Sequence, residues 1–94
     1  MARNRAAAPI ELKIPATAAY VLVAKRTAGA LAATAGFSLE AIDELNIAVA
    51  QACQRAIGVG ERVWGQGQAS LKLSFRLNDG GMEVDVRTVP SREA

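Results

Sequence analysis

Two alternating segments joined by a glycine-containing turn constrain this chain more than any other feature. Apolar residues occupy every second position of segment 71–77 and again of segment 82–86, with polar residues between them. This period of two is typical of strands that bury one face. The linker 78–81 reads Asn-Asp-Gly-Gly, which favours a hairpin with Asp79 and Gly80 as a type I′ turn. The sequence therefore predicts an antiparallel hairpin near the C-terminus.

That turn sets a single register between the two strands, because it brings their apolar positions opposite one another. The facing pairs are Leu77 with Met82, Phe75 with Val84 and Leu73 with Val86. On the other face Arg76 meets Glu83, an opposite-charge pair of the kind worth about 0.2–1 kcal/mol. The apolar pattern and the charge pattern agree on the same register.

Upstream, the sequence predicts a third strand and a first helix. Ile10, Leu12 and Ile14 alternate with charged residues, which indicates a short strand over 9–14. A helix over 18–35 follows, with Thr17 as its N-cap residue. Gly36 stands where a left-handed residue ends a helix, and Phe37 supplies the hydrophobic contact beyond it.

A second helix begins after Ser38, which is a suitable cap and is followed by acidic residues in the early turns. Apolar residues recur along it at three- and four-residue steps and predict its inward stripe. These residues are Ile42, Leu45, Val49, Ala52, Cys53 and Ala56. We expect Gly58 and Gly60 to end the helix and residues 58–68 to form a glycine-rich loop that carries Trp64.

The predicted order is strand, helix, helix, strand, strand. A sheet with one apolar face and two helices to cover it makes a two-layer α+β sandwich, with a small and mainly antiparallel sheet. We expect one domain over 9–90, a disordered tail over 1–8 and a short tail over 91–94.

Composition excludes several classes of function. The chain contains no histidine and one cysteine, Cys53, which we predict to be a small residue of the core. A single cysteine cannot form an internal disulfide, which fits a protein of a reducing compartment. A net charge of +2 from eleven basic and nine acidic residues lacks the basic footprint of a nucleic-acid-binding protein. No uncharged run approaches the about 20 residues that cross a bilayer, and no signal peptide is evident. We therefore expect a cytoplasmic protein without a metal site.

The first helix places small apolar residues where charges are expected on an outer surface. Its charges are Lys25 and Arg26 alone, while Leu22, Gly29 and Ala33 fall on the side away from the sheet. Alanine is a good helix former whether exposed or buried, so these residues alone do not require a partner. The alternative is a surface that a second helix approaches closely. This alternative predicts an interface, most simply between two identical subunits.

The stretch from 14 to 57 resembles the anti-sigma-factor serine kinases of bacteria, which belong to the GHKL ATPase superfamily with the histidine-kinase ATP-binding domains. Three runs carry the resemblance: Gly-Phe-Ser at 36–38, Ile-Asp-Glu-Leu-Asn-Ile-Ala-Val at 42–49, and Ala-Gln-Ala-Cys-Gln-Arg-Ala-Ile at 50–57. The family pattern at the last run is close to Ser-Glu-Ala-Cys-Thr-Asn-Ala-Val. The resemblance implies part of a histidine-kinase-like ATPase fold, and Mg-ATP as cofactor only if its chemistry is retained.

This sequence departs from the family at the residues that handle the nucleotide. The resemblance implies a glutamate that acts as a base, where this chain has Gln51, and an asparagine that binds magnesium, where it has Arg55. Glutamine cannot accept a proton at neutral pH, and a guanidinium offers no lone pair to a metal. Thr88 replaces the aspartate that receives the adenine, and Pro90 replaces a following glycine. The printed chain ends at Ala94, before the family's lid and later glycine box.

These departures favour a degenerate and truncated member that binds proteins and has lost its nucleotide site. Its partner would be a sigma factor, an antagonist or a paralogous kinase. Two other hypotheses remain open at this stage: an active ATP-dependent serine kinase, and a self-associating structural subunit. Candidate interface residues are Leu22, Lys25, Arg26, Gly29, Ala33 and Trp64.

Single residues have more than one interpretation. Arg55 either neutralises phosphate or extends into solvent from its helix, which we favour. Trp64 either folds back onto the edge of the core or anchors an interface. Lys25 and Arg26 fall near the place where family members present a basic residue to their antagonist, and ordinary solvated charges are the alternative.

Overall fold

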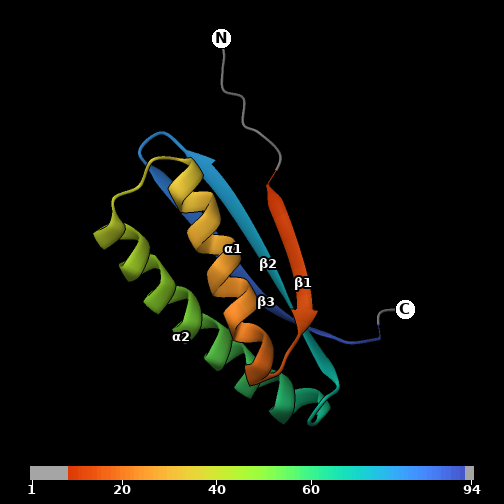
Figure 1. Ribbon diagram of the computed structural model, residues 1–94. Coiled ribbons are helices and arrows are strands. Elements are labelled where there is room, and N and C mark those ends of the chain that lie inside the picture. The colour runs from red at the N-terminus through yellow and green to blue at the C-terminus, as the bar shows by residue number, and fades with distance from the viewer. Residues whose placement is uncertain (1–8, 93–94) are drawn as a thin grey trace.

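The computed structural model describes residues 9–92, so the predicted tail 1–8 and the end of the predicted tail 91–94 lie outside the described residues. Strand β1 (Ile10–Pro15) leads through a short 3₁₀ turn (Ala18–Tyr20) into helix α1 (Val21–Thr34). Helix α2 (Leu39–Trp64) follows, and strands β2 (Ala69–Asn78) and β3 (Gly81–Pro90) complete the order. Both helices lie on one side of the sheet (Figure 1). The predicted two-layer α+β sandwich is confirmed.

The sheet has the order β1-β2-β3, and both strand pairs are antiparallel. The predicted hairpin register is confirmed, since Phe75 pairs with Val84 and Arg76 with Glu83. Strand β1 joins the other edge of β2, where Ile10 pairs with Phe75. The alternation that predicted the hairpin therefore also aligns β1, because all three strands place their apolar side chains on the helix side.

The predicted type I′ turn is wrong, although the hairpin itself is right. A type I′ turn requires positive φ at both central residues. Gly80 has a φ of +81°, whereas Asp79 is not among the residues with positive φ. The Cβ atom of Asp79 disfavours the left-handed region, so glycine alone takes it in this turn.

The junction between the helices follows its sequence signals closely. Gly36 has a φ of +87°, its N–H donates to the Ala33 carbonyl, and the Phe37 N–H donates to the Ala32 carbonyl. This pair of bonds is a Schellman motif. Ser38 caps α2 by accepting from the Ala41 N–H at 3.1 Å. At the other end of α1 the first turn is 3₁₀, and the Thr17 side chain makes no capping bond.

The predicted end of α2 at Gly58 and Gly60 is wrong, because the helix continues to Trp64 and ends at Gly65. The residues expected to form a loop over 58–64 are helical. A Cβ atom added at Gly60 would lie 2.7 Å from the Ala69 Cβ and 2.9 Å from the Thr88 Cγ2. Gly60 therefore stands inside the helix to let it approach the sheet, rather than to end it.

The core lies between the helices and the inner face of the sheet. Phe75, Leu71 and Leu73 of β2 are its largest fully buried residues, followed by the smaller Cys53 of α2. Alanines at positions 24, 28 and 32 are fully buried and form the inner side of α1, which packs mainly against α2. Within the described residues no helix is long and apolar enough to cross a membrane.

Candidate protein-binding surface

The outer side of α1 is unusually apolar for a surface helix. Leu22 is 53% exposed and Val23 is 41% exposed, and Ala30 and Ala33 are exposed as well. The hydroxyl of Thr27 donates to the Val23 carbonyl one turn earlier, at 2.8 Å. Thr34 donates in the same way to Ala30. Because these hydroxyls bond within their own helix, α1 offers few polar groups to solvent or to a partner.

A shallow hollow opens where this side of α1 meets α2. It has a volume of about 350 Å³. We call it the seam hollow, and it is lined by Leu22, Lys25, Arg26, Gly29, Ala30 and Asn46. Four of the six candidate interface residues from the sequence therefore surround one depression.

The other two candidates lie elsewhere. Ala33 is exposed on α1, one turn beyond Gly29, and does not line the hollow. Trp64 is the last residue of α2 and is 38% exposed. The structure thus places Trp64 on a helix end rather than in the glycine-rich loop where the sequence analysis put it.

Sequence reasoning overlooked Asn46 as a candidate site residue. A Cβ built at Gly29 lies 3.7 Å from both the Oδ1 and the Nδ2 of Asn46, so the amide packs flat beneath the glycine. The signal was available, because Asn46 falls four residues after Ile42 and three before Val49 on an otherwise apolar stripe. A polar residue in such a stripe calls for a hydrogen-bond partner.

The positions of the family's nucleotide site are exposed or otherwise engaged. Gln51 and Arg55 are exposed on α2, four residues apart, while Val49 and Cys53 face the core. Thr88 of β3 donates its hydroxyl hydrogen to the Ala56 carbonyl of α2 at 2.9 Å. Its side chain therefore ties the sheet to the helix.

These residues do not fit Mg-ATP. Magnesium requires oxygen ligands, and the guanidinium at position 55 supplies only N–H donors. Among the described residues there is no group of three or more His, Cys, Asp or Glu side chains that could hold a metal ion.

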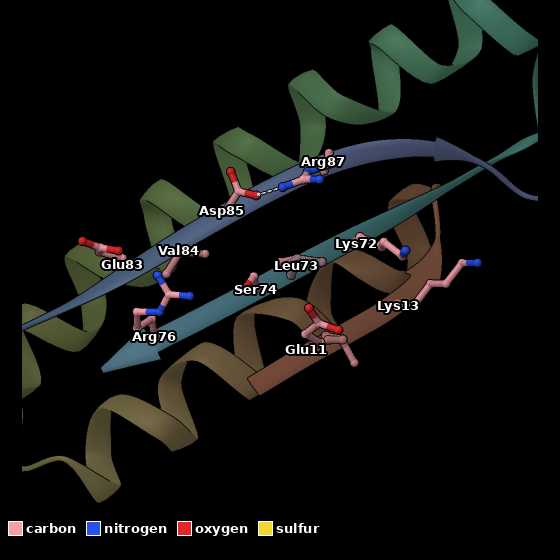
Figure 2. A pocket seen from close by; sticks show the side chains of 11 residues that line it. Glu11, Lys13, Lys72, Leu73, Ser74, Arg76, Glu83, Val84, Asp85 and Arg87 are labelled. Atoms are coloured by element: carbon pink, nitrogen blue, oxygen red, sulfur yellow. Dashed lines mark hydrogen bonds and ion pairs between the residues drawn. The ribbon is translucent and has the colours of Figure 1, made fainter. Parts of the chain in front are cut away.

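The face of the sheet away from the helices carries a second and larger hollow of about 680 Å³ (Figure 2). Lys13, Lys72 and Arg87 are paired in register there, in one row across the three strands. In the next row Asp85 accepts a hydrogen bond from Arg87, at 3.2 Å from its Nη2. Four basic and three acidic side chains line this hollow, so its charge is nearly balanced. We interpret it as a solvated sheet face.

Cys53 is fully buried in the core, as predicted. Burial raises the pKa of its thiol, because the thiolate loses hydration there. The protonated thiol is a poor nucleophile and a poor metal ligand. Its surroundings therefore agree with a packing role.

The chain forms a β-α-α-β-β domain and is similar in sequence to bacterial serine-protein kinases. The chain is 31% identical over 86 residues to serine-protein kinase RsbW of Listeria monocytogenes, which covers 84% of this chain and 55% of that protein. It is 30% identical over 89 residues to serine-protein kinase RsbW of Bacillus cereus and of Bacillus anthracis, covering 88% of this chain and 56% of theirs. No family model matches the chain.

These similarities confirm the resemblance to the serine-kinase family that residues 36–57 indicated. The chain spans about half the length of the curated relatives it matches.

Proposed function

We propose that this protein is a non-catalytic regulator of the anti-sigma type, which acts by binding a protein partner. One observation carries the loss of catalysis: the three positions expected to handle the nucleotide hold Gln51, Arg55 and Thr88. Gln51 and Arg55 are exposed, and Thr88 bonds to the backbone of α2. Phosphoryl transfer depends on metal-assisted charge neutralisation and positioning, and these side chains supply neither. The kinship to RsbW supports a role in partner switching with a sigma factor or its antagonist.

Calorimetric titration with ATP and magnesium tests the loss of the nucleotide site. We expect no heat of binding for the natural chain at millimolar nucleotide. A micromolar dissociation constant would overturn the proposal and favour the active serine kinase. The double variant Gln51→Glu with Arg55→Asn restores the family's two side chains, so it is the matched chain in which to look for regained affinity.

The surface of α1 supports the binding half of the proposal. It combines exposed aliphatic side chains with threonines whose hydroxyls bond within the helix. Exposed apolar surface of this kind marks contact sites more often than solvated faces. We place the partner interface on the outer side of α1, with the seam hollow at its centre.

A second copy of this chain is the simplest partner for that surface, and an isologous contact would bring Gly29 near its symmetry mate. Light scattering over a dilution series tests this directly. If the homodimer forms through α1, Gly29→Glu and Ala33→Glu will yield folded monomers, while Gln54→Glu, on the exposed side of α2, will leave the dimer intact. A strict monomer at high concentration would leave a different protein as the partner.

A further inference from the structure

Strand β3 gives the sheet a long open edge. Within residues 9–92 the strand order is β1-β2-β3, and no strand pairs with the far side of β3. Its pairing with β2 runs through all ten residues without a break in register. Proteins protect such an edge with devices that include a bulge, a proline or an inward-pointing charge. Residues 82–88 contain none of these three, so this edge is open to another strand.

The backbone of β3 presents hydrogen-bonding groups to the open edge at every second residue. The N–H of Ser91 donates to the Gln68 carbonyl at 2.9 Å, just beyond the last pair of the β2–β3 ladder. Alternate residues of an antiparallel strand bond to the same neighbour, so the odd-numbered residues of β3 bond to β2. The N–H and carbonyl groups of Val84, Val86 and Thr88 therefore point to the open edge.

The apolar face of the sheet is incompletely covered along this edge. Leu73 of β2 is fully buried, whereas its partner Val86 on β3 is only partly buried. The same difference separates Phe75 from its partner Val84. Both valines pack against the core from its margin. A further strand beside β3 would remove more of their apolar surface from water, which favours association.

The charges of β3 select a second copy of the same strand as the occupant. Figure 2 shows Glu83, Asp85 and Arg87 along β3 on the outer face of the sheet. A twofold axis at Val86 sets Asp85 opposite Arg87 of the second copy, and this pair occurs twice. An axis at Asp85 or at Arg87 sets that residue opposite its own mate, and an axis at Val84 sets Glu83 opposite Asp85. Like charges directly opposite are destabilising, so the register centred on Val86 is favoured.

We infer that two copies of this chain pair antiparallel through the open edges of β3 and join their sheets into one. In this dimer Val86 pairs with its own mate, and Val84 pairs with Thr88 of the second copy. Strand β1 offers a shorter edge of six residues, against ten in β3. Helix α1 packs mainly against α2, so the dimer leaves the outer side of α1 free. The inference does not depend on the loss of the nucleotide site.

The first test exchanges the two charges. Asp85→Arg alone and Arg87→Asp alone each set like charges opposite one another at two symmetric places. We expect each to raise the dimer dissociation constant about tenfold or more, measured by sedimentation equilibrium. The double variant restores opposite charges across the axis and should restore dimerisation. The Arg87 and Asp85 side chains are 71% and 62% exposed, so every variant should keep the circular dichroism spectrum of the natural chain.

A matched control lies at the other edge of the sheet. Lys13→Glu reverses an outer-face charge on β1, which takes no part in the proposed pairing. It should leave the dimer dissociation constant unchanged. A loss of dimer in this variant would place the contact at β1 and overturn the inference.

The second test determines the register. With the axis at Val86, the two Cα atoms of that residue lie about 5.5 Å apart, within the range of a disulfide. We expect Val86→Cys, in a Cys53→Ala background, to form a covalent dimer under mild oxidation, seen by non-reducing electrophoresis. Val84→Cys in the same background is the matched control. Its own mate would lie about four residues along the strand, roughly 13 Å away, so it should stay monomeric on the gel.

The remaining outcomes separate this dimer from the proposed function. A strict monomer at the highest soluble concentration would overturn the inference, and so would a dimer that neither charge variant weakens. Self-association lost with Gly29→Glu but kept with Asp85→Arg would place the contact on α1 instead. Each of these results leaves a non-catalytic regulator standing. Binding of ATP and magnesium by the natural chain would overturn that function and leave the β3 dimer untouched.

Discussion

The hydroxyl of Thr88 on β3 donates a hydrogen bond to the carbonyl oxygen of Ala56 on α2, with 2.9 Å between the two oxygens. This bond crosses from the sheet to the helix layer at a partly buried position. Thr88→Val keeps the shape and removes the donor, so we expect a loss of about 0.5–1.5 kcal/mol in the free energy of unfolding. Urea denaturation measures it. Thr88→Ser retains the hydroxyl and should lose less, and equal losses would mean that packing, rather than the bond, matters.

The close approach at Gly60 gives a second prediction. Gly60→Ala would place a methyl group 2.7 Å from the Ala69 Cβ, so the helix must move away from the sheet. We expect this overpacking to cost about 1–3 kcal/mol, which outweighs the about 1 kcal/mol gained in helix propensity. Gly58→Ala is the matched control, because its nearest contact is the flexible Arg62 side chain at 3.5 Å. A stabilising Gly60→Ala variant would contradict the packing at this position.

The hairpin turn depends on the positive φ of Gly80. Gly80→Val forces a β-branched residue into the left-handed region, at a cost of about 1–2 kcal/mol. Thermal unfolding followed by circular dichroism should show the lower stability. Gly80→Asn is the comparison variant, since asparagine tolerates this conformation better. Unchanged melting of the valine variant would argue against the turn.

Cys53 makes stability depend on alkaline pH. Folding raises the pKa of its thiol through burial, so the folded protein holds the proton more tightly than the unfolded chain. The stability that the buried, protonated thiol contributes is therefore complete below the pKa of about 8.5 that the thiol has in the unfolded chain. It diminishes as the pH rises above that value. We expect the free energy of unfolding to fall as the pH rises above about 8.5, and Cys53→Ala to weaken that slope. An identical slope in both proteins would assign it to other groups.

The layers and the sheet register could be predicted from sequence because their signals are local and repeated. Phe75 and Val84 belong to two alternating patterns separated by a short turn, and a one-residue slip would turn every apolar side chain outward. The junction between the helices could also be predicted from sequence, because Gly36 and Ser38 each act on backbone groups close to them in the chain.

The end of α2 and the seam hollow could not be predicted because both depend on contacts distant in sequence. Gly60 looks like a helix terminator until β3 brings Thr88 against it. The position of Asn46 on an apolar stripe indicates burial, but that Gly29 of α1 covers it depends on how the two helices pack. The predicted turn type was wrong for a local reason, because Asp79 and Gly80 also fit a turn in which only glycine has positive φ.

The position of β1 has a kinetic consequence. Its pairing of Ile10 with Phe75 closes a separation of 65 residues (75 minus 10), whereas the β2–β3 hairpin closes on itself through its own turn. Loop-closure entropy disfavours the distant pairing until intervening segments have condensed. We therefore expect the hairpin and the helices to assemble before β1 docks. In native-state hydrogen exchange, we expect the amides of β1 to exchange through the opening of lowest free energy, in which β1 detaches from β2.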